Sequence, residues 1–238
     1  MPKEVYNGIV LRTVDYKESD RILSVFTGEK GLLTVGARGC RKPKSKLSAF
    51  STQFCFGEIE VSEHAGKLQL SAATLRESFY PIRESYEQLY SATQVVKSAE
   101  RILTEGIPNE ELFLLVYNSL SLIAYGENDP VDIELCYLAK LLKQGGYSPV
   151  LTYCVRCGRD LRSNKQLRFS PSAGGCVCES CGGQYSSVSA LSMEALRRML
   201  ILDPAEMRRV RLPDSVREEL RPLLYGYAEY VFDIPLRR

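Results

Sequence analysis

Short apolar runs separated by turn residues fill the first 80 positions of the chain. Runs rich in β-branched and aromatic residues and bounded by glycine predict strands rather than helices. The connections at residues 27–31 and 62–66 have the length and composition of hairpin loops. Five strands in so short a segment predict a small barrel, and an OB-type Greek-key barrel has this strand count and size, although the count leaves an SH3-like barrel open. The predicted strands are 8–16, 21–26, 32–35, 54–61 and 67–70.

Beyond Pro81 the apolar residues recur at a helical period. Asp129 and Pro130 predict the N-cap and first turn of one helix, and Pro222 lies inside another, where it predicts a kink or a break. The chain is therefore predicted to be α+β, with an OB-type barrel over residues 1–80 and an all-helical domain over residues 81–238. The helical patterns cover residues 82–103, 112–123, 130–144, 192–202 and 214–232.

Cysteine and glycine replace the helical pattern at about residues 153–185. This insert contains two Cys-x-x-Cys pairs, Cys154 with Cys157 and Cys178 with Cys181, separated by 20 residues. Two such pairs can surround one zinc ion with four thiolates, and the glycine after each pair favours a tight turn with positive φ. Four thiolates leave no open coordination position, so the spacing predicts one structural Zn²⁺ rather than a catalytic one.

Alternatives to this ligand set remain open. A redox dithiol of the thioredoxin type explains one Cys-x-x-Cys pair but not two, and iron in place of zinc is a further alternative. Cys176 could replace Cys178, because residues two apart point to the same side of an extended segment. We favour Cys178, since only Cys178 and Cys181 repeat the spacing of the first pair. The other cysteines are predicted to be buried as small hydrophobic residues: Cys40, Cys55 and Cys136.

The segment between Gly31 and Gly57 contains no acidic residue. Glycine and proline interrupt its basic part, which predicts a flexible loop that leaves the third strand with its charges at one rim of the barrel. Such a loop suits a phosphate backbone, whereas the alternative is a solvated loop without a partner. The basic residues are Arg38, Arg41, Lys42, Lys44 and Lys46. Nearby aromatic residues are more typical of a barrel core, but any exposed one could stack on bases: Tyr16, Phe26, Phe50, Phe54 and Phe56.

The small net charge of +2 conceals an uneven distribution. Residues 1–80 carry a charge of +3, residues 81–150 carry −5, and residues 151–238 carry +4. This asymmetry favours a polyanion that contacts the two ends of the chain.

Few classes of enzyme fit the composition. A single histidine, His64, excludes most catalytic zinc sets and the Ser/His/Asp hydrolases, and no phosphate-loop, dinucleotide or HExxH motif is present. We therefore predict that the protein is not an enzyme. No apolar run approaches the about 18 residues of a membrane span, and the first residues lack the apolar core of a signal peptide. These features predict a cytoplasmic protein without a membrane partner.

Several motifs together resemble the RecO family of bacterial DNA repair proteins. They are the segments GIVLRT at 8–13, GLLTV at 31–35 and GARG at 36–39, followed by the two cysteine pairs. The resemblance covers essentially the whole chain, with Cys176 and Pro222 as departures. It implies an N-terminal OB fold, a helical domain and an inserted zinc motif.

The resemblance also implies a function, that of a recombination mediator of the RecF pathway. Such a protein binds single- and double-stranded DNA, anneals complementary strands and, with RecR, helps RecA replace SSB on single-stranded DNA, near the nucleoid during repair. It contacts the C-terminal tail of SSB, which is acidic with an apolar end. The basic loop at residues 38–46 is our hypothesis for the DNA-binding surface. The alternative is a zinc-stabilised adaptor for nucleic acid or protein that has no annealing activity.

Overall fold

A computed structural model describes residues 3–236 of the chain. It divides into two compact units, residues 1–125 and 126–238. Within the described residues, no helix combines the length and the apolar character that crossing a membrane requires.

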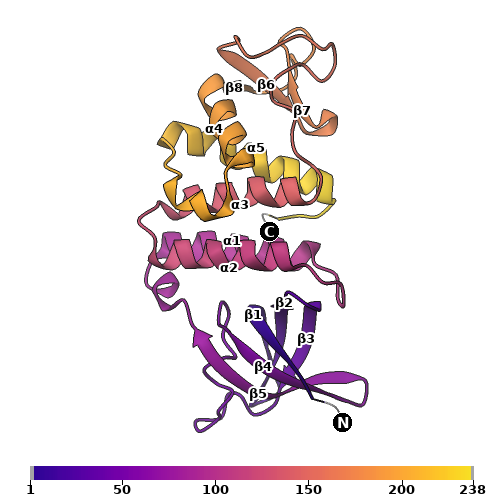
Figure 1. Ribbon diagram of the computed structural model, residues 1–238, viewed down its shortest axis with the longest axis vertical. Coiled ribbons are helices and arrows are strands. Elements are labelled where there is room, and N and C mark those ends of the chain that lie inside the picture. Colours follow the sequence, from indigo (N-terminus) through magenta and orange to yellow (C-terminus); the bar gives the residue numbers. More distant parts are fainter. Residues whose placement is uncertain (1–2, 237–238) are drawn as a thin grey trace. The chain divides into compact units, whose positions relative to one another are not determined.

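The first unit contains a closed five-stranded barrel (Figure 1). Its strands are β1 (Lys3–Tyr16), β2 (Asp20–Thr27), β3 (Gly31–Ala37), β4 (Phe56–His64) and β5 (Lys67–Glu77). They follow the order β1-β2-β3-β5-β4, and β4 closes the barrel by pairing with β1. The pairing of β3 with β5 is parallel and the other pairings are antiparallel. This connectivity is that of an OB-type Greek-key barrel, so it confirms the predicted fold and excludes the SH3-like alternative.

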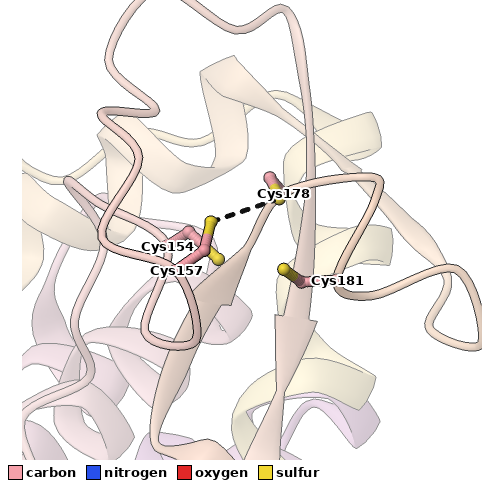
Figure 2. Close-up of side chains that lie close together, drawn as sticks. All are labelled: Cys154, Cys157, Cys178 and Cys181. Atoms are coloured by element: carbon pink, nitrogen blue, oxygen red, sulfur yellow. Dashed lines mark hydrogen bonds between the residues drawn. The ribbon is translucent and has the colours of Figure 1, made fainter.

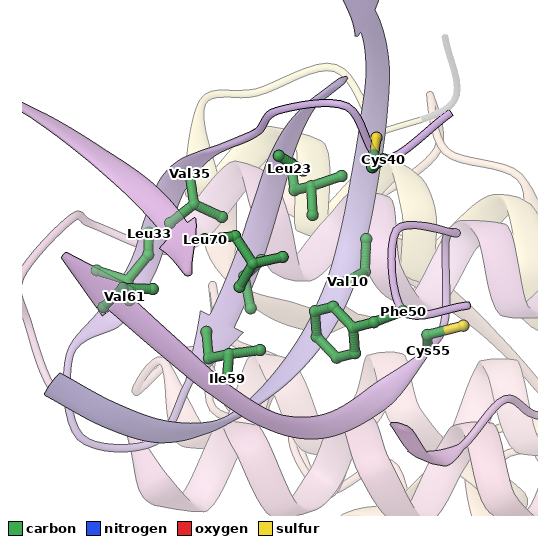
Figure 3. Close-up of a cluster of buried hydrophobic side chains, with 12 residues drawn as sticks. Val10, Leu23, Leu33, Val35, Cys40, Phe50, Cys55, Ile59, Val61 and Leu70 are labelled. Atoms are coloured by element: carbon green, nitrogen blue, oxygen red, sulfur yellow. The ribbon is translucent and has the colours of Figure 1, made fainter. Parts of the chain in front are cut away.

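Alternate residues of the strands fill the barrel interior (Figure 3). Val10, Leu23, Val35 and Ile59 are fully buried there. Each such aliphatic side chain contributes about 1.5–3 kcal/mol by leaving water. Phe50, from the long loop between β3 and β4, is 1% exposed and completes this core. The loop is therefore part of the hydrophobic core and not merely a connection.

Two helices belong to the same compact unit as the barrel: α1 (Tyr86–Ile102) and α2 (Glu110–Tyr125). Phe113 of α2 packs edge-on against Phe26 of β2, with ring centroids 5.4 Å apart. The change from strand to helix occurs close to residue 80, as the sequence pattern predicts, but the compact unit continues to Tyr125. Aromatic contacts between helix and barrel explain this, because they bury apolar surface of both.

In the second unit, α3 (Pro130–Gln144) is buried along most of its length. The Asp129 side chain accepts a hydrogen bond from the Val131 N–H at 2.9 Å, which confirms the predicted N-cap. Buried carboxylates on this helix pair with arginines of α5 (Asp214–Phe232), as in the 2.7 Å contact between Asp132 and Arg217. These pairs fix α3 against α5 through charge-assisted hydrogen bonds.

Helix α5 continues through Pro222, so of the predicted kink or break the break does not occur. Buried residues on both sides of the proline, including Leu220 and Leu224, keep the two halves packed. Tertiary packing thus outweighs the loss of one backbone hydrogen bond.

The cysteine-rich insert forms a small antiparallel sheet of order β7-β6-β8, next to α4 (Ala190–Ile201). Its strands are β6 (Gln166–Ser170), β7 (Gly175–Val177) and β8 (Ser187–Ser189). Strands of three to five residues are too short for an alternating pattern to stand out in the sequence. The insert is joined to α5 by the edge-on packing of Phe169 against Tyr227.

Candidate functional site

The structure brings the four cysteines of the two Cys-x-x-Cys pairs together (Figure 2). The sulfur atoms of Cys154, Cys157, Cys178 and Cys181 all lie within 4.8 Å of one another. The sulfurs of Cys157 and Cys178 are 3.7 Å apart. Four sulfurs at about 2.3 Å from a tetrahedral metal ion such as zinc would be separated by about 3.8 Å, so the cluster is compact enough that it could hold a metal ion.

Tight backbone turns build the first pair. Cys154 donates its N–H to the Arg159 carbonyl at 2.7 Å, and the Gly158 N–H donates to the Cys154 carbonyl at 2.8 Å. Gly158 has φ +74°, the left-handed conformation predicted for the residue after the pair.

In the second pair, the Gly182 N–H donates to the Cys178 carbonyl at 2.9 Å. Gly182 is not in the left-handed region, contrary to the prediction for it. It is required for another reason, because a Cβ atom there would collide with Val177. The exposed Arg156 side chain connects the pairs by donating to the Cys181 carbonyl at 3.0 Å.

The four thiols influence each other's ionisation. Burial raises the pKa of Cys154, but hydrogen bonds from the backbone around Cys178, Cys157 and Arg156 outweigh it and lower that pKa to about 6. Side-chain hydrogen bonds with Cys178 and Cys157, followed by burial, raise the pKa of Cys181 to about 12. Four closely spaced thiols cannot all lose their protons unless a positive charge neutralises the thiolates that result. A divalent cation supplies that charge, so the cluster could bind a metal ion.

Cys176 lies outside this cluster. Its side chain is fully buried, and its sulfur lies 3.4 Å from the Met193 sulfur. The backbone of Cys176 is tied to the chain before the first pair, because its N–H donates to the Val150 carbonyl at 2.7 Å. The structure therefore assigns Cys178 and Cys176 different surroundings, and only Cys178 faces the other three cysteines. The isolated cysteines are buried as predicted: Cys40, Cys55 and Cys136.

All five basic residues of the loop after β3 are exposed, as a phosphate-binding surface requires: Arg38, Arg41, Lys42, Lys44 and Lys46. One of them is near a carboxylate, since the Arg41 guanidinium lies 3.4 Å from Asp15. That pair is exposed on both sides and contributes little to stability.

The backbone of this loop is held in place, which differs from the flexible loop that its composition predicts. Gly39 donates its N–H to the Asp20 carboxylate at 2.7 Å, and Arg41 donates its N–H to the Ser19 carbonyl at 3.0 Å. The Gly39 hydrogen bond lowers the pKa of Asp20 below its usual value. The buried side chains of Cys40 and Phe50 anchor both ends of the loop in the barrel core. The charges therefore project from a defined series of turns.

Beside the loop, a groove of about 680 Å³ runs across β2 and β3. The β1–β2 turn forms one wall with Tyr16 and Lys17, and the β4–β5 turn forms another with Gly66 and Lys67. Arg38 lines the groove and also begins the basic loop, so the two surfaces are continuous. OB folds bind oligonucleotides and oligosaccharides on this face and between these two turns.

Of the aromatic residues singled out near the barrel, only Tyr16 is exposed, at 49%. Phe26, Phe50 and Phe54 are at most 1% exposed, and the half-buried Phe56 packs against helix α2. Four of these five residues are therefore unavailable for stacking on bases.

Two other basic residues of the barrel form ion pairs with carboxylates. Arg12 binds Glu100 at 2.6 Å and Arg21 binds Asp15 at 2.9 Å. His64 is exposed at the end of β4, next to the β4–β5 turn.

Two family models match the chain almost from end to end. "Recombination protein O N terminal" matches residues 1–79, and "Recombination protein O C terminal" matches residues 83–238. The chain belongs to the RecO family. Its resemblance to that family in the barrel and cysteine motifs is thereby confirmed.

Relatives of similar length carry the name DNA repair protein RecO. That of Desulforamulus reducens is 30% identical over 234 residues, which are 97% of this chain and 90% of the relative. That of Desulfitobacterium hafniense strain DCB-2 is 31% identical over 237 residues, which are 97% of this chain and 86% of the relative. The protein from Moorella thermoacetica is 28% identical over 233 residues, with 97% and 86% coverage.

A second groove lies in the helical unit of this RecO family member, and the sequence patterns did not reveal it. It has a volume of about 290 Å³ between α4 and residues 209–216. Leu191, Met199 and Val216 contribute apolar surface to it. Arginines also line it: Arg198, Arg209 and Arg211. The arginines come from two distant segments of sequence, so no local run of charge indicates their proximity.

Lys17 and Lys67 of the barrel groove were also missed. Each lies near acidic residues in sequence, which hides it from a search for basic runs. Their positions in the β1–β2 and β4–β5 turns of an OB barrel were the available signal.

Proposed function

We propose that this protein is a DNA repair and recombination mediator that binds single- and double-stranded DNA, anneals complementary strands and, with RecR, helps RecA replace SSB. It acts in the cytoplasm, at the nucleoid during repair. The observation that supports this proposal most strongly is the exposed, one-sided basic loop at residues 38–46 on an OB barrel of a RecO-family chain.

Annealing requires a surface that neutralises two phosphate backbones and leaves the bases free to pair. Arginine and lysine side chains that project from an anchored loop can do this for either strand, because they contact phosphates without reading bases. With about five phosphate contacts on single strands, the logarithm of the binding constant should fall with the logarithm of the salt concentration at a slope of about −3 to −4.

The metal in the thiol cluster is, in this proposal, one structural Zn²⁺ ion held by Cys154, Cys157, Cys178 and Cys181. Four thiolates leave no position for a substrate or water, so the ion would stabilise the fold of the insert. It would join the segment around residue 154 to the one around residue 178, in addition to backbone hydrogen bonds such as that from the Val155 N–H to the Cys176 carbonyl at 3.0 Å.

The groove beside α4 is our proposed site for the C-terminal tail of SSB. Apolar side chains such as Leu191 and Met199 suit the apolar end of the tail, and the arginines suit its acidic part. Arg198 is paired with Glu194, whereas Arg211 donates to the carbonyls of Arg208 and Val210 and, within residues 3–236, forms no ion pair. Arg211 is therefore the strongest candidate to bind a carboxylate.

A labelled peptide of the SSB tail tests this placement. It should bind the full-length protein, and Arg211→Ala should weaken binding about 10-fold, as expected for a hydrogen-bonded charge pair worth about 1.5 kcal/mol. Arg162→Ala, in the insert, is the matched control because Arg162 already binds Asp160. Equal affinity of the unaltered protein and the Arg211→Ala variant would exclude this position for the tail.

Strand annealing separates the mediator from the adaptor alternative. The unaltered protein should accelerate pairing of complementary oligonucleotides, first naked and then coated with SSB, and the acceleration should fall as salt rises. An adaptor would bind its partner without accelerating pairing. The mediator makes and breaks no covalent bond, so end-labelled strands should keep their length throughout. Shortened strands would indicate a nuclease instead.

A further inference from the structure

The groove on the barrel has chemistry that the basic loop lacks. Tyr16 is the one aromatic residue that lines it, and its ring lies at the wall formed by the β1–β2 turn. Lys17, the next residue, has φ +54° and places its ammonium 5.3 Å from the centroid of the Tyr16 ring. A lysine in the left-handed conformation is uncommon, and here it allows the charge and the ring to lie together.

A β-bulge turns Tyr16 outward. The pairing of β1 with β2 shifts register between Val10 and Arg12, so Val10 lies opposite Val25 but Thr13 lies opposite Leu23, and the residues after Leu11 change face. Without this shift, Tyr16 would share the inward face of Val10, because both are even-numbered positions of one strand. Because of the bulge, Tyr16 lies on the outer face of the barrel and is exposed.

The groove carries charges of both signs. Its basic residues are Lys17, Arg21, Arg38 and Lys67, and its carboxylates are Asp20 and Glu105. The carboxylates repel phosphate, and carboxylates accept hydrogen bonds from exocyclic amino groups of bases. A nucleic acid strand is thus favoured with its phosphates beside the basic residues and its base amino groups beside the carboxylates.

Gly36 lines the groove without a side chain of its own. A Cβ atom there would approach the Gln69 side-chain nitrogen to 2.7 Å and would displace that amide. Apolar surface from Ile22 and Leu68 lies beside this position. Apolar surface next to an exposed ring suits the faces of unpaired bases.

We propose that the groove is a subsite for single-stranded DNA in which the Tyr16 ring stacks on an unpaired base. This inference rests on the proposed DNA-binding function and adds a division of labour to it. The basic loop binds the backbone of either single- or double-stranded DNA, whereas the groove holds only a strand whose bases are free. In a duplex the base faces are stacked on each other and are unavailable to the ring.

A tryptophan probe tests the stacking directly, because the chain contains no tryptophan. In the Tyr16→Trp variant, single-stranded DNA should quench the fluorescence, whereas a duplex of the same length should bind with little quenching. The control is Tyr86→Trp, at a position that is 75% exposed and outside the groove. Its fluorescence should not respond to either DNA.

Affinity gives an independent test. Tyr16→Ala should weaken single-strand binding about 5- to 100-fold, the range measured for one stacked base, and leave duplex binding unchanged. Tyr16→Phe should restore the affinity, because stacking requires the ring and not the hydroxyl. Circular dichroism of each variant establishes that the barrel is folded.

The results distinguish failure of the stacking subsite from failure of the proposed function. If the Tyr16→Trp variant bound and annealed DNA while its fluorescence stayed unquenched, the stacking subsite would be overturned and the mediator function would remain intact. Equal loss of single-strand and duplex affinity in Tyr16→Ala would also overturn the subsite. If the unaltered protein bound no DNA, the proposed function itself would fail.

Discussion

The thiol cluster and the basic loop are both compact in sequence, but they differ in where their side chains point. Four sulfurs converge to within 4.8 Å of one another, two of them in buried cysteines. The charges at residues 38–46 instead project into solvent from a loop that is anchored at Gly39 and Phe50. A cation requires a single point that all ligands reach, whereas a polyanion requires a surface.

This difference predicts how each region responds to substitution. A converging site is lost with any one ligand, because the remaining three cannot complete a tetrahedral shell. A dispersed surface loses only one phosphate contact with each basic residue removed. The comparison can therefore be tested by single and multiple substitutions in the thiol cluster and in the basic loop.

The largest effect is expected for Cys178→Ser. Bound zinc should fall from about one ion per chain to nearly none, with loss of the metal's folding free energy in the insert, which is about 10–16 kcal/mol for a structural site. Atomic absorption and thermal unfolding measure the two effects. Cys176→Ser is the control and should keep its zinc, because that thiol contacts Met193. Full occupancy in Cys178→Ser would contradict the ligand set.

A large effect on DNA binding is expected only when all five basic residues of the loop are replaced by alanine. For single strands, the slope of the logarithm of the binding constant against the logarithm of the salt concentration should change from about −3 to −4 to nearly zero. Each phosphate contact contributes about −0.7 to this slope. Fluorescence anisotropy over a salt series measures this. A slope that stays unchanged would place the phosphate contacts elsewhere.

Acidity should affect the two regions differently. Hydrogen bonds with Cys178 and Cys157 raise the pKa of the Cys181 thiol to about 12, so this group is protonated at neutral pH before the metal binds. Metal binding must release its proton, and zinc affinity should therefore rise with pH. The basic loop uses no thiol to contact DNA, so DNA affinity should not follow this rise with pH. Chelator competition and DNA titrations at each pH test the contrast; zinc affinity independent of pH would contradict it.

The smallest effect is expected for Arg41→Ala. Loss of one phosphate contact should reduce the magnitude of the salt slope by about 0.7 and leave annealing largely intact. The ion pair with Asp15 at 3.4 Å is exposed, so protein stability should hardly change. Complete loss of DNA binding in this variant would mean that the loop acts as a converging site after all.

Much of the fold could be predicted from periodicity. The five barrel strands and the helices match the alternation and helical repeats of the sequence, and Asp129 marks one helix start correctly. The strands of the insert were missed because they are short, and the continuity of α5 through Pro222 depends on tertiary packing. The cysteine motifs and the basic loop were visible because each is local in sequence.

The remaining parts of the candidate sites depend on long-range structure. The Cys-x-x-Cys spacing favours Cys178 over Cys176, and the packing of the Cys176 thiol against Met193 removes the alternative that the sequence left open. Tyr16 was one of several candidate aromatics, and the bulge after Val10 decides that it is exposed. The arginine-lined groove joins α4 to a later segment, which no local pattern reveals.

The location of the annealing surface is the central claim, and one comparison tests it most directly. The rate of pairing of complementary oligonucleotides would be measured for the unaltered protein, the five-alanine loop variant and a charge-matched control. The control replaces five other exposed basic residues by alanine: Lys97, Arg101, Arg159, Lys165 and Arg208. We predict that the loop variant loses its acceleration of pairing while the control keeps it. Equal rates in the two variants would contradict a surface at residues 38–46.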